Sequence, residues 1–334
     1  MKLLEVCVDS LASARAAKQG GADRLEFCSA LAVGGLTPYA DLLRQIKAEL
    51  DLPVRCLMRP RAGDFLYTRD ELELLCRQIE TLRSAGADGF VIGALTPEGA
   101  LDLPAMRTLL DACGGAPVTL HRCIDVSRDL CATYRAAAAL GIDTVLTSGG
   151  AGSCRKGISQ LAALLRLRDE LDGPEVLIGA GVNAAVIDEL RVALPGARAF
   201  HASCKTLLES GMTFRREGVP MGLPGLDEWH IQQTDADAVR AAKAAVMRGA
   251  RADRTSALHL CIAAKQKCLP FFEPAGAFSF VVIGVIKQTK HRCFFQIRFR
   301  VGTHRADGPE FVGCLRPFSP VAAAGAAFCG HRGL

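Results

Sequence analysis

The strongest constraint on the fold is a short joint that occurs three times in the first half of the chain. Each joint is a glycine, one further residue and an aspartate, followed at once by an apolar run, at residues 21–25, 86–90 and 141–145. Glycine ends a helix readily because it accepts the left-handed backbone conformation. The joints are 65 and 55 residues apart, which fits two strand–helix units of about 30 residues between them. The repeat therefore predicts alternating strands and helices.

The rest of the chain extends this alternation. Eight apolar runs are expected to form strands, at residues 3–9, 23–29, 54–60, 89–95, 118–124, 144–149, 175–180 and 198–204. Seven segments between them have helical periodicity, at residues 11–19, 39–50, 69–85, 104–112, 132–140, 159–171 and 184–194. Eight parallel strands in about 205 residues favour an α/β fold of the (β/α)8 TIM-barrel type over an open sheet. The first turn also lacks the glycine pattern of dinucleotide-binding folds.

A change in composition marks a domain boundary near residue 247. Residues 1–247 carry a net charge of −4, whereas residues 248–334 carry +9. We expect a barrel domain at 1–247, completed by a helix at 234–246 that Thr234 or Asp235 caps. We expect residues 248–334 to be a basic, Phe- and Cys-rich tail that is disordered or read in a non-native frame. The alternative is a small basic module with strand-like pieces at 278–286 and 293–301.

Several partner classes are disfavoured by the sequence. No known nucleic-acid motif accompanies the basic tail, so a nucleic-acid partner is not expected. The longest apolar run, residues 277–286, is half the length that a membrane-spanning helix needs, so no membrane partner is expected. Glu5 and Asp9 interrupt the first apolar run, which argues against a secretion signal. We therefore expect fourteen reduced cysteines and a cytoplasmic protein, with a nuclear location left open.

Polar residues gather where the predicted strands end. Active sites of barrels lie at the carboxyl ends of the strands. The candidate catalytic residues at these ends are Glu5, Glu26, Arg59, Arg61, His121 and Asp125. Buried carboxylates need partners, and the two arginines supply them. These residues predict one polar cluster at the mouth of the barrel, which is either a catalytic site or a satisfied structural network.

The loops after the last two strands form a second candidate site. Barrels commonly bind phosphate at these loops through backbone N–H groups. The candidate anion-binding residues here are Gly179, Gly181 and Ser203.

Two cysteines differ from the others by their place in the pattern. Cys7 and Cys28 each follow a glutamate by two residues at the ends of consecutive strands. Alternation puts each cysteine on the same face as its glutamate. Thiolates are ligands that the soft ion Cu(I) prefers. Cys7 and Cys28 are therefore candidate copper ligands.

Longer strings in the chain match a known family. The matching segments are residues 5–10, 20–28, 34–38, 59–67, 121–125, 145–149 and 200–203. In order and spacing they resemble the CutC copper-homeostasis family, in particular its animal-like branch, from residue 1 to about 246. The resemblance implies a cytosolic TIM barrel, a homodimer or homotetramer, and Cu(I) binding through Cys7 and Cys28.

Two classes of function remain open from the sequence. The first is a Cu(I)-binding protein of copper homeostasis. The second is a metal-independent barrel enzyme acting on a small anionic ligand. In the second, His121 or Glu26 acts as acid or base, and Arg59 and Arg61 hold the anion.

Overall fold

The computed structural model describes residues 2–216, 218–219, 221–222, 228–248, 279–289, 292–302 and 311–312 of the chain. It divides into two compact units, Met1–Ala252 and Asp253–Leu334. Each unit is described by itself.

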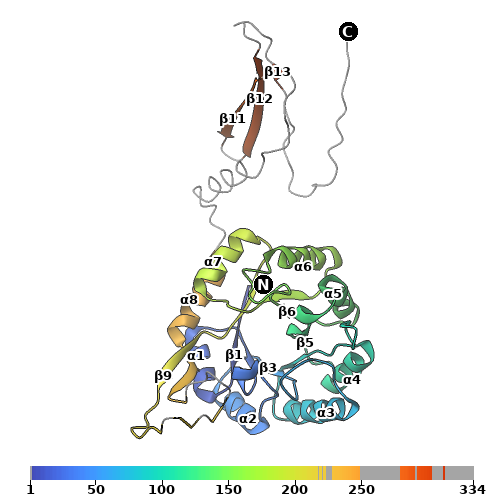
Figure 1. Cartoon of the computed structure of the whole chain (residues 1–334), viewed down its shortest axis with the longest axis vertical. Helices are drawn as coiled ribbons and strands as arrows, with labels where there is room; N and C mark the ends of the chain where they lie inside the picture. Colours follow the sequence, from blue (N-terminus) through green and yellow to red (C-terminus); the bar gives the residue numbers. More distant parts are fainter. Residues whose placement is uncertain are drawn as a thin grey trace. The chain divides into compact units, whose positions relative to one another are not determined.

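The first unit is a closed barrel of eight parallel strands in sequential order (Figure 1). The strands are β1 (Leu3–Val8), β2 (Arg24–Phe27), β3 (Val54–Leu57), β4 (Gly89–Ile92), β5 (Val118–Leu120), β6 (Thr144–Thr147), β7 (Glu175–Ile178) and β8 (Ala199–Ala202). The helices around them are α1 (Leu11–Gly20), α2 (Ala40–Glu49), α3 (Arg69–Ser84), α4 (Leu103–Cys113), α5 (Leu130–Ala139), α6 (Ile158–Leu171), α7 (Ala184–Ala193) and α8 (Ala236–Met247). Two 3-10 turns, η1 (Leu31–Val33) and η2 (Arg122–Val126), follow β2 and β5. The predicted TIM barrel is confirmed.

The repeated joints have a common structural role. In each joint the glycine has a positive φ, between 74° and 99°. The aspartate two residues later accepts a hydrogen bond from the backbone of the preceding strand. The donors are the N–H groups of Leu4, Val54 and Val118, at 2.6 to 2.8 Å from Asp23, Asp88 and Asp143. Each joint therefore ends a helix and pins two neighbouring strands at the amino-terminal end of the barrel.

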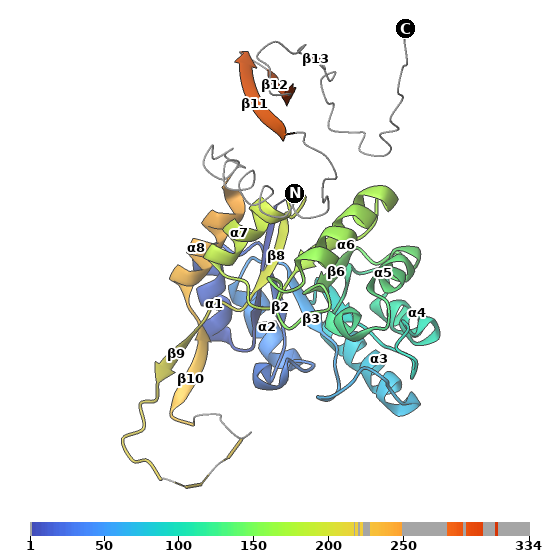
Figure 2. The same ribbon diagram turned by 45° about the horizontal axis from the view of Figure 1, so that its top comes forward.

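The closing helix is confirmed and begins at the predicted cap. The carboxylate of Asp235 accepts from the N–H of Ala238 at 2.6 Å, so α8 starts one residue later. Where α8 crosses α1, a Cβ at Gly20 would lie 2.4 Å from the Cβ of Val239. Only glycine permits that approach. Before α8 lies a two-stranded ribbon, β9 (Lys205–Glu209) with β10 (His230–Thr234), visible in Figure 2.

The second unit contains an antiparallel sheet. Its strands are β11 (Ser279–Thr289), β12 (Arg292–Gly302) and β13 (Phe311–Val312), in that order. The first two cover the strand-like pieces expected from the sequence at 278–286 and 293–301. The prediction of a disordered or non-native tail at 248–334 falls mostly outside the described residues. A search of the described helices finds no segment that is long and apolar enough to cross a membrane.

We expect the barrel to fold without residues 249–334. The eight barrel strands and α8 precede this segment, and α8 packs against α1 and α7. A chain truncated after Arg248 should melt within about 3 °C of the full-length protein, which corresponds to about 1 kcal/mol for a domain of this size. Differential scanning calorimetry of both chains measures the shift. An insoluble product or a much lower melting temperature would contradict the prediction.

Candidate functional site

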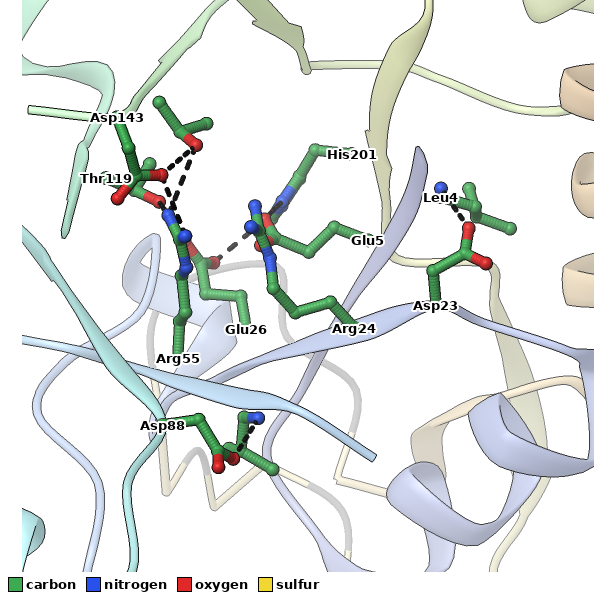
Figure 3. A network of polar contacts seen from close by, with 12 residues as sticks. Leu4, Glu5, Asp23, Arg24, Glu26, Arg55, Asp88, Thr119, Asp143 and His201 are labelled. Carbon is green, nitrogen blue, oxygen red and sulfur yellow. Dashed lines mark hydrogen bonds and ion pairs between the residues drawn. The ribbon is translucent and has the colours of Figure 1, made fainter. Parts of the chain in front are cut away.

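A buried ion-pair network crosses the point where the barrel closes. Parallel pairing sets Glu5 of β1 beside Arg24 of β2 on one side and His201 of β8 on the other. The Arg24 Nε donates to Glu5 Oε2 at 2.5 Å, and the His201 Nδ1 lies 2.8 Å from Glu5 Oε1. Figure 3 shows the three side chains pointing toward one another. Glu5 is fully buried, so these two partners provide the charge compensation that its burial requires.

The network keeps charge inside the barrel. Burial alone would raise the pKa of Glu5, but the positive charge of Arg24 and the hydrogen bond from His201 lower it to about 2. Burial lowers the pKa of His201, but the neighbouring Glu26, Cys7 and Glu5 outweigh it and raise this pKa well above 6.5. Glu5 is therefore an anion, and its neighbours favour the protonated form of His201.

Three potential metal ligands meet next to this network. Cys7 pairs with Glu26 in the β1–β2 register, so both side chains lie on the inner face of the barrel. A thiol sulfur, a carboxylate oxygen and an imidazole nitrogen of Cys7, Glu26 and His201 all lie within 4.8 Å of one another. The His201 Nε2 is 3.7 Å from the Glu26 Oε2. Burial, together with the charge of Glu5, raises the pKa of Glu26 to about 7 although His201 opposes the shift.

These three residues line a cavity of about 260 Å³ at the carboxyl ends of the strands, which we call the mouth cavity. Arg59, after β3, and His121, after β5, line the same cavity together with Phe65. Of the predicted catalytic residues, Glu26, Arg59 and His121 therefore reach one site, and Glu5 supports it from the adjacent network. Of the predicted anion-binding residues, Gly181 and Ser203 line the cavity.

Arg59 is held in the cavity by backbone carbonyls. Arg59 Nη1 donates to the carbonyls of Val33 and Gly35 at 3.0 and 3.1 Å, and Nη2 donates to the carbonyl of Gly63 at 3.0 Å. Arg59 is 9% exposed, and the salt bridges found among the described residues include none to it. Its charge is therefore buried without a carboxylate partner in the described part of the chain.

His121 is neutral in this site. Its Nδ1 accepts from the N–H of Cys123 at 3.2 Å, so its proton sits on Nε2. Burial, and then the positive charge of Arg59, lowers the pKa of His121 to about 3.

The low pKa of His121 predicts acid sensitivity. An unfolded chain protonates this imidazole below about pH 6.5, whereas the folded protein does so only near pH 3. The stability that His121 contributes is therefore complete above pH 6.5 and is lost as pH falls toward 3. In His121→Asn, which keeps an acceptor for Cys123, stability should depend less on pH in this window, by up to about 1 kcal/mol per pH unit. Urea unfolding at a series of pH values measures this, and parallel profiles for the two proteins would contradict it.

Three of the predicted residues serve the loops rather than the cavity. Arg61 pairs with Glu71, at 2.6 Å, and with Asp64 on the surface. The carboxylate of Asp125 accepts from the Thr147 hydroxyl at 2.5 Å and from backbone N–H groups at 148 and 150, which holds the loop after β6. Gly179 lies behind the cavity, where a Cβ would meet the Leu146 side chain at 2.8 Å. In the described structure none of the three lines the mouth cavity.

Cys28 comes directly after β2, two residues after Glu26, which is the residue that pairs with Cys7. Its thiol donates to the carbonyl of Val8 at 3.5 Å and packs in a small apolar cluster with Leu57 and Val91. Burial raises the pKa of this thiol strongly. Among the described residues, the group of three close ligands contains Cys7 but not Cys28.

Two important residues were not among the sequence-based candidates. Arg24 precedes Glu26 by two residues, and His201 precedes Ser203 by two, so strand alternation puts each on the face of a residue that was selected. The missing information is the register between β1 and β8, which joins Glu5 to His201.

The comparisons with known proteins identify the family and agree with the fold. A family model described as the CutC family matches residues 2–206. A CutC family protein of Chromobacterium violaceum is 40% identical over 73% of this chain and 98% of its own. A human protein named copper homeostasis protein cutC homolog is 39% identical over 71% of this chain and 86% of its own. The crystal structure of a CutC protein from Streptococcus agalactiae superposes with a TM-score of 0.57 at 27% identity, covering 61% of this chain and 99% of that one. With the family model matching well over half of its length, the chain belongs to the CutC family.

Proposed function

We propose that this protein binds Cu(I) at the mouth of the barrel and serves copper homeostasis. The observation that carries the proposal is the meeting of the Cys7 thiol, the His201 imidazole and the Glu26 carboxylate within 4.8 Å. The name of the human relative, which refers to copper homeostasis, supports the choice of metal.

The network behind His201 orients it as a ligand. Glu5 Oε1 accepts the proton on Nδ1, and Arg24 holds the other carboxylate oxygen. A ligating histidine typically donates its second ring N–H to a carboxylate, which fixes the tautomer and the ring orientation. With Nδ1 engaged in this way, Nε2 is the atom left for a metal, and it is the atom that faces Glu26.

The donor set suits a soft ion. A thiolate and an imidazole are ligands for Cu(I), and the carboxylate of Glu26 is a weaker, harder donor beside them. Zn(II) accepts the same three donors, so it is the competing metal that an experiment must include. Ligand protons must leave as a metal binds. His201, whose pKa is raised, and the Cys7 thiol are the groups that release them.

Cys28 remains part of the proposal as a secondary thiol ligand outside the group of three close ligands. It follows Glu26 by two residues, but it must give up its hydrogen bond to Val8 and its proton before it can ligate. We therefore assign Cys7 and His201 as the principal ligands, with Cys28 contributing less.

Location and assembly complete the proposal. We propose a cytosolic protein, supported by the fact that all nine described cysteines are free thiols. We also propose a homodimer or homotetramer, supported by the exposed apolar side chains of Leu207, Leu208 and Ile231 on the β9–β10 ribbon. Light scattering of the purified full-length protein measures the assembly.

The test of the copper site is a set of serine variants. Reduced full-length protein is titrated with Cu(I) against a chromogenic Cu(I) chelator without oxygen. Cys7→Ser should weaken binding by at least about 100-fold, because even outer partners of a metal ligand contribute about 10- to 100-fold. Cys28→Ser should weaken it less than Cys7→Ser does. Cys131→Ser is the matched control, since this half-buried thiol on α5 lies outside the group of ligands.

The result can contradict the proposal in two ways. If Cys7→Ser binds Cu(I) as well as the wild-type protein does, the site is wrong. If Zn(II) displaces stoichiometric Cu(I), the site exists but the metal is wrong. His201→Asn, which should also weaken Cu(I) binding, separates a site on Cys7 and His201 from one built on the two thiols alone.

A further inference from the structure

We propose that the mouth cavity also binds a small organic carboxylate, which Arg59 and His121 hold. Arg59 and His121 follow β3 and β5, whereas Cys7, Glu26 and His201 lie on β1, β2 and β8. The inference does not depend on the copper proposal, because it rests on different residues and needs no metal.

The first observation is the uncompensated charge of Arg59. Three hydrogen bonds from its guanidinium go to backbone carbonyls, which are neutral acceptors. Its Nε is buried and has no hydrogen-bond partner in the described structure. A guanidinium has five donors arranged to match a carboxylate, and a buried charge is costly without an opposite one. The backbone therefore fixes Arg59 in place, and a ligand must supply the negative charge.

The second observation is an unused donor on His121. Since its Nδ1 accepts from Cys123, the proton is on Nε2, and this buried atom also has no partner among the described residues. A neutral imidazole N–H is a hydrogen-bond donor that adds no charge. The site thus combines one positive charge with one neutral donor.

Phe65 joins the two donors into one site. Its ring centroid is 4.7 Å from that of His121, and the Arg59 Cζ lies 5.3 Å from the same ring. Phe65 comes from the loop between β3 and α3, is half-buried and lines the cavity. Its ring packs against both the His121 imidazole and the Arg59 guanidinium. A ligand that reaches Nε of Arg59 and Nε2 of His121 has to displace or slide beside this ring.

Charge and size narrow the ligand class. The other arginine in the cavity, Arg122, is already paired with Asp125 at 2.7 Å and donates to Ser148. One unpaired positive charge fits a singly charged carboxylate better than a doubly charged phosphate. The cavity of about 260 Å³ is below the usual range for drug-sized ligands, and Leu31, Leu57 and Leu146 line it. We therefore expect a carboxylate with a short aliphatic body.

The experiment compares butyrate with butyramide on metal-free, full-length protein. Butyramide has the same shape without the charge, and inorganic phosphate is the third probe. Binding is followed by calorimetry and by the NMR resonance of the Arg59 Nε–H, which is identified by its absence in Arg59→Lys. Butyrate should bind at least ten times more tightly than butyramide or phosphate and should shift this resonance.

Two matched variants test the assignment. Arg59→Met should abolish the preference for butyrate over butyramide. Arg61→Met is the control, because this arginine is two residues away but pairs with surface carboxylates. If Arg59→Met fails to fold, the shift of the Nε–H resonance in the wild-type protein decides alone. Equal binding of butyrate and butyramide, an unmoved Nε–H resonance, or tighter binding of phosphate would each overturn the proposal.

Discussion

Replacing Arg24 with methionine is expected to lower the free energy of unfolding by about 3–5 kcal/mol. In the described structure Glu5 forms ion pairs with two side chains, Arg24 and His201. Of the two, Arg24 is the one that is always charged. Glu5 is fully buried, and its pKa of about 2 shows how strongly these partners favour the anion. Without Arg24 the buried carboxylate keeps only His201. Leaving a buried charge short of a partner costs far more than the ion pair itself contributes.

The measurement is urea unfolding of the wild-type protein, Arg24→Met and the double variant Glu5→Gln/Arg24→Met. The double variant should recover part of the loss, since it also removes the carboxylate that lost its arginine partner. Arg15→Met is the matched control, because the Arg15–Glu49 pair is about half exposed and such pairs contribute less than about 1 kcal/mol. A loss in Arg24→Met no larger than that in Arg15→Met would contradict the argument.

Gly93→Ala is expected to destabilise the barrel by about 3 kcal/mol and to disturb the mouth cavity. Gly93 follows β4 directly, and a Cβ there would lie 2.5 Å from both the Cys123 Sγ and the His121 Cε1. Both neighbours are buried, and the hydrogen bond from Cys123 N–H holds the imidazole in place. Overpacking of this kind costs about 1–3 kcal/mol, and the upper end applies because two neighbours must move.

Thermal unfolding measures the loss in Gly93→Ala, and a butyrate titration measures the effect on the cavity. Gly152→Ala is the control, because a Cβ there meets nothing within 4 Å and its φ is not positive. That variant should be close to neutral. A Gly93→Ala protein with wild-type stability and an unchanged butyrate titration would contradict the packing argument.

The fold could be predicted from the sequence because its signals are local. In each joint the glycine ends a helix, and the aspartate accepts a hydrogen bond from the preceding strand. The apolar runs show where the strands are. The β9–β10 ribbon could not be predicted in this way. Half of its residues are exposed and only Thr234 is buried, so no apolar alternation marks them as strands.

The candidate site could be predicted where strand alternation still applied. Glu5 and Glu26 lie on strands and point inward, as expected. Arg61 was selected with Arg59 because both follow the third predicted strand, but β3 ends at Leu57 and the chain turns before Arg61. Arg61 therefore points to surface carboxylates. The register between strands is a long-range property that strand alternation does not reveal. It puts Cys7 beside Glu26 and His201 beside Glu5, and His201 was therefore not selected.

The contact between Glu5 and His201 also limits when the site can form. These residues are 196 positions apart and meet only when β8 pairs with β1. Cys7 and Glu26 are among the first residues to be synthesised, whereas His201 is synthesised only after the residues of the first seven strands. A nascent or cleaved chain that lacks β8 thus has the thiol and the carboxylate without the imidazole, so the complete group of ligands exists only in a barrel that has closed.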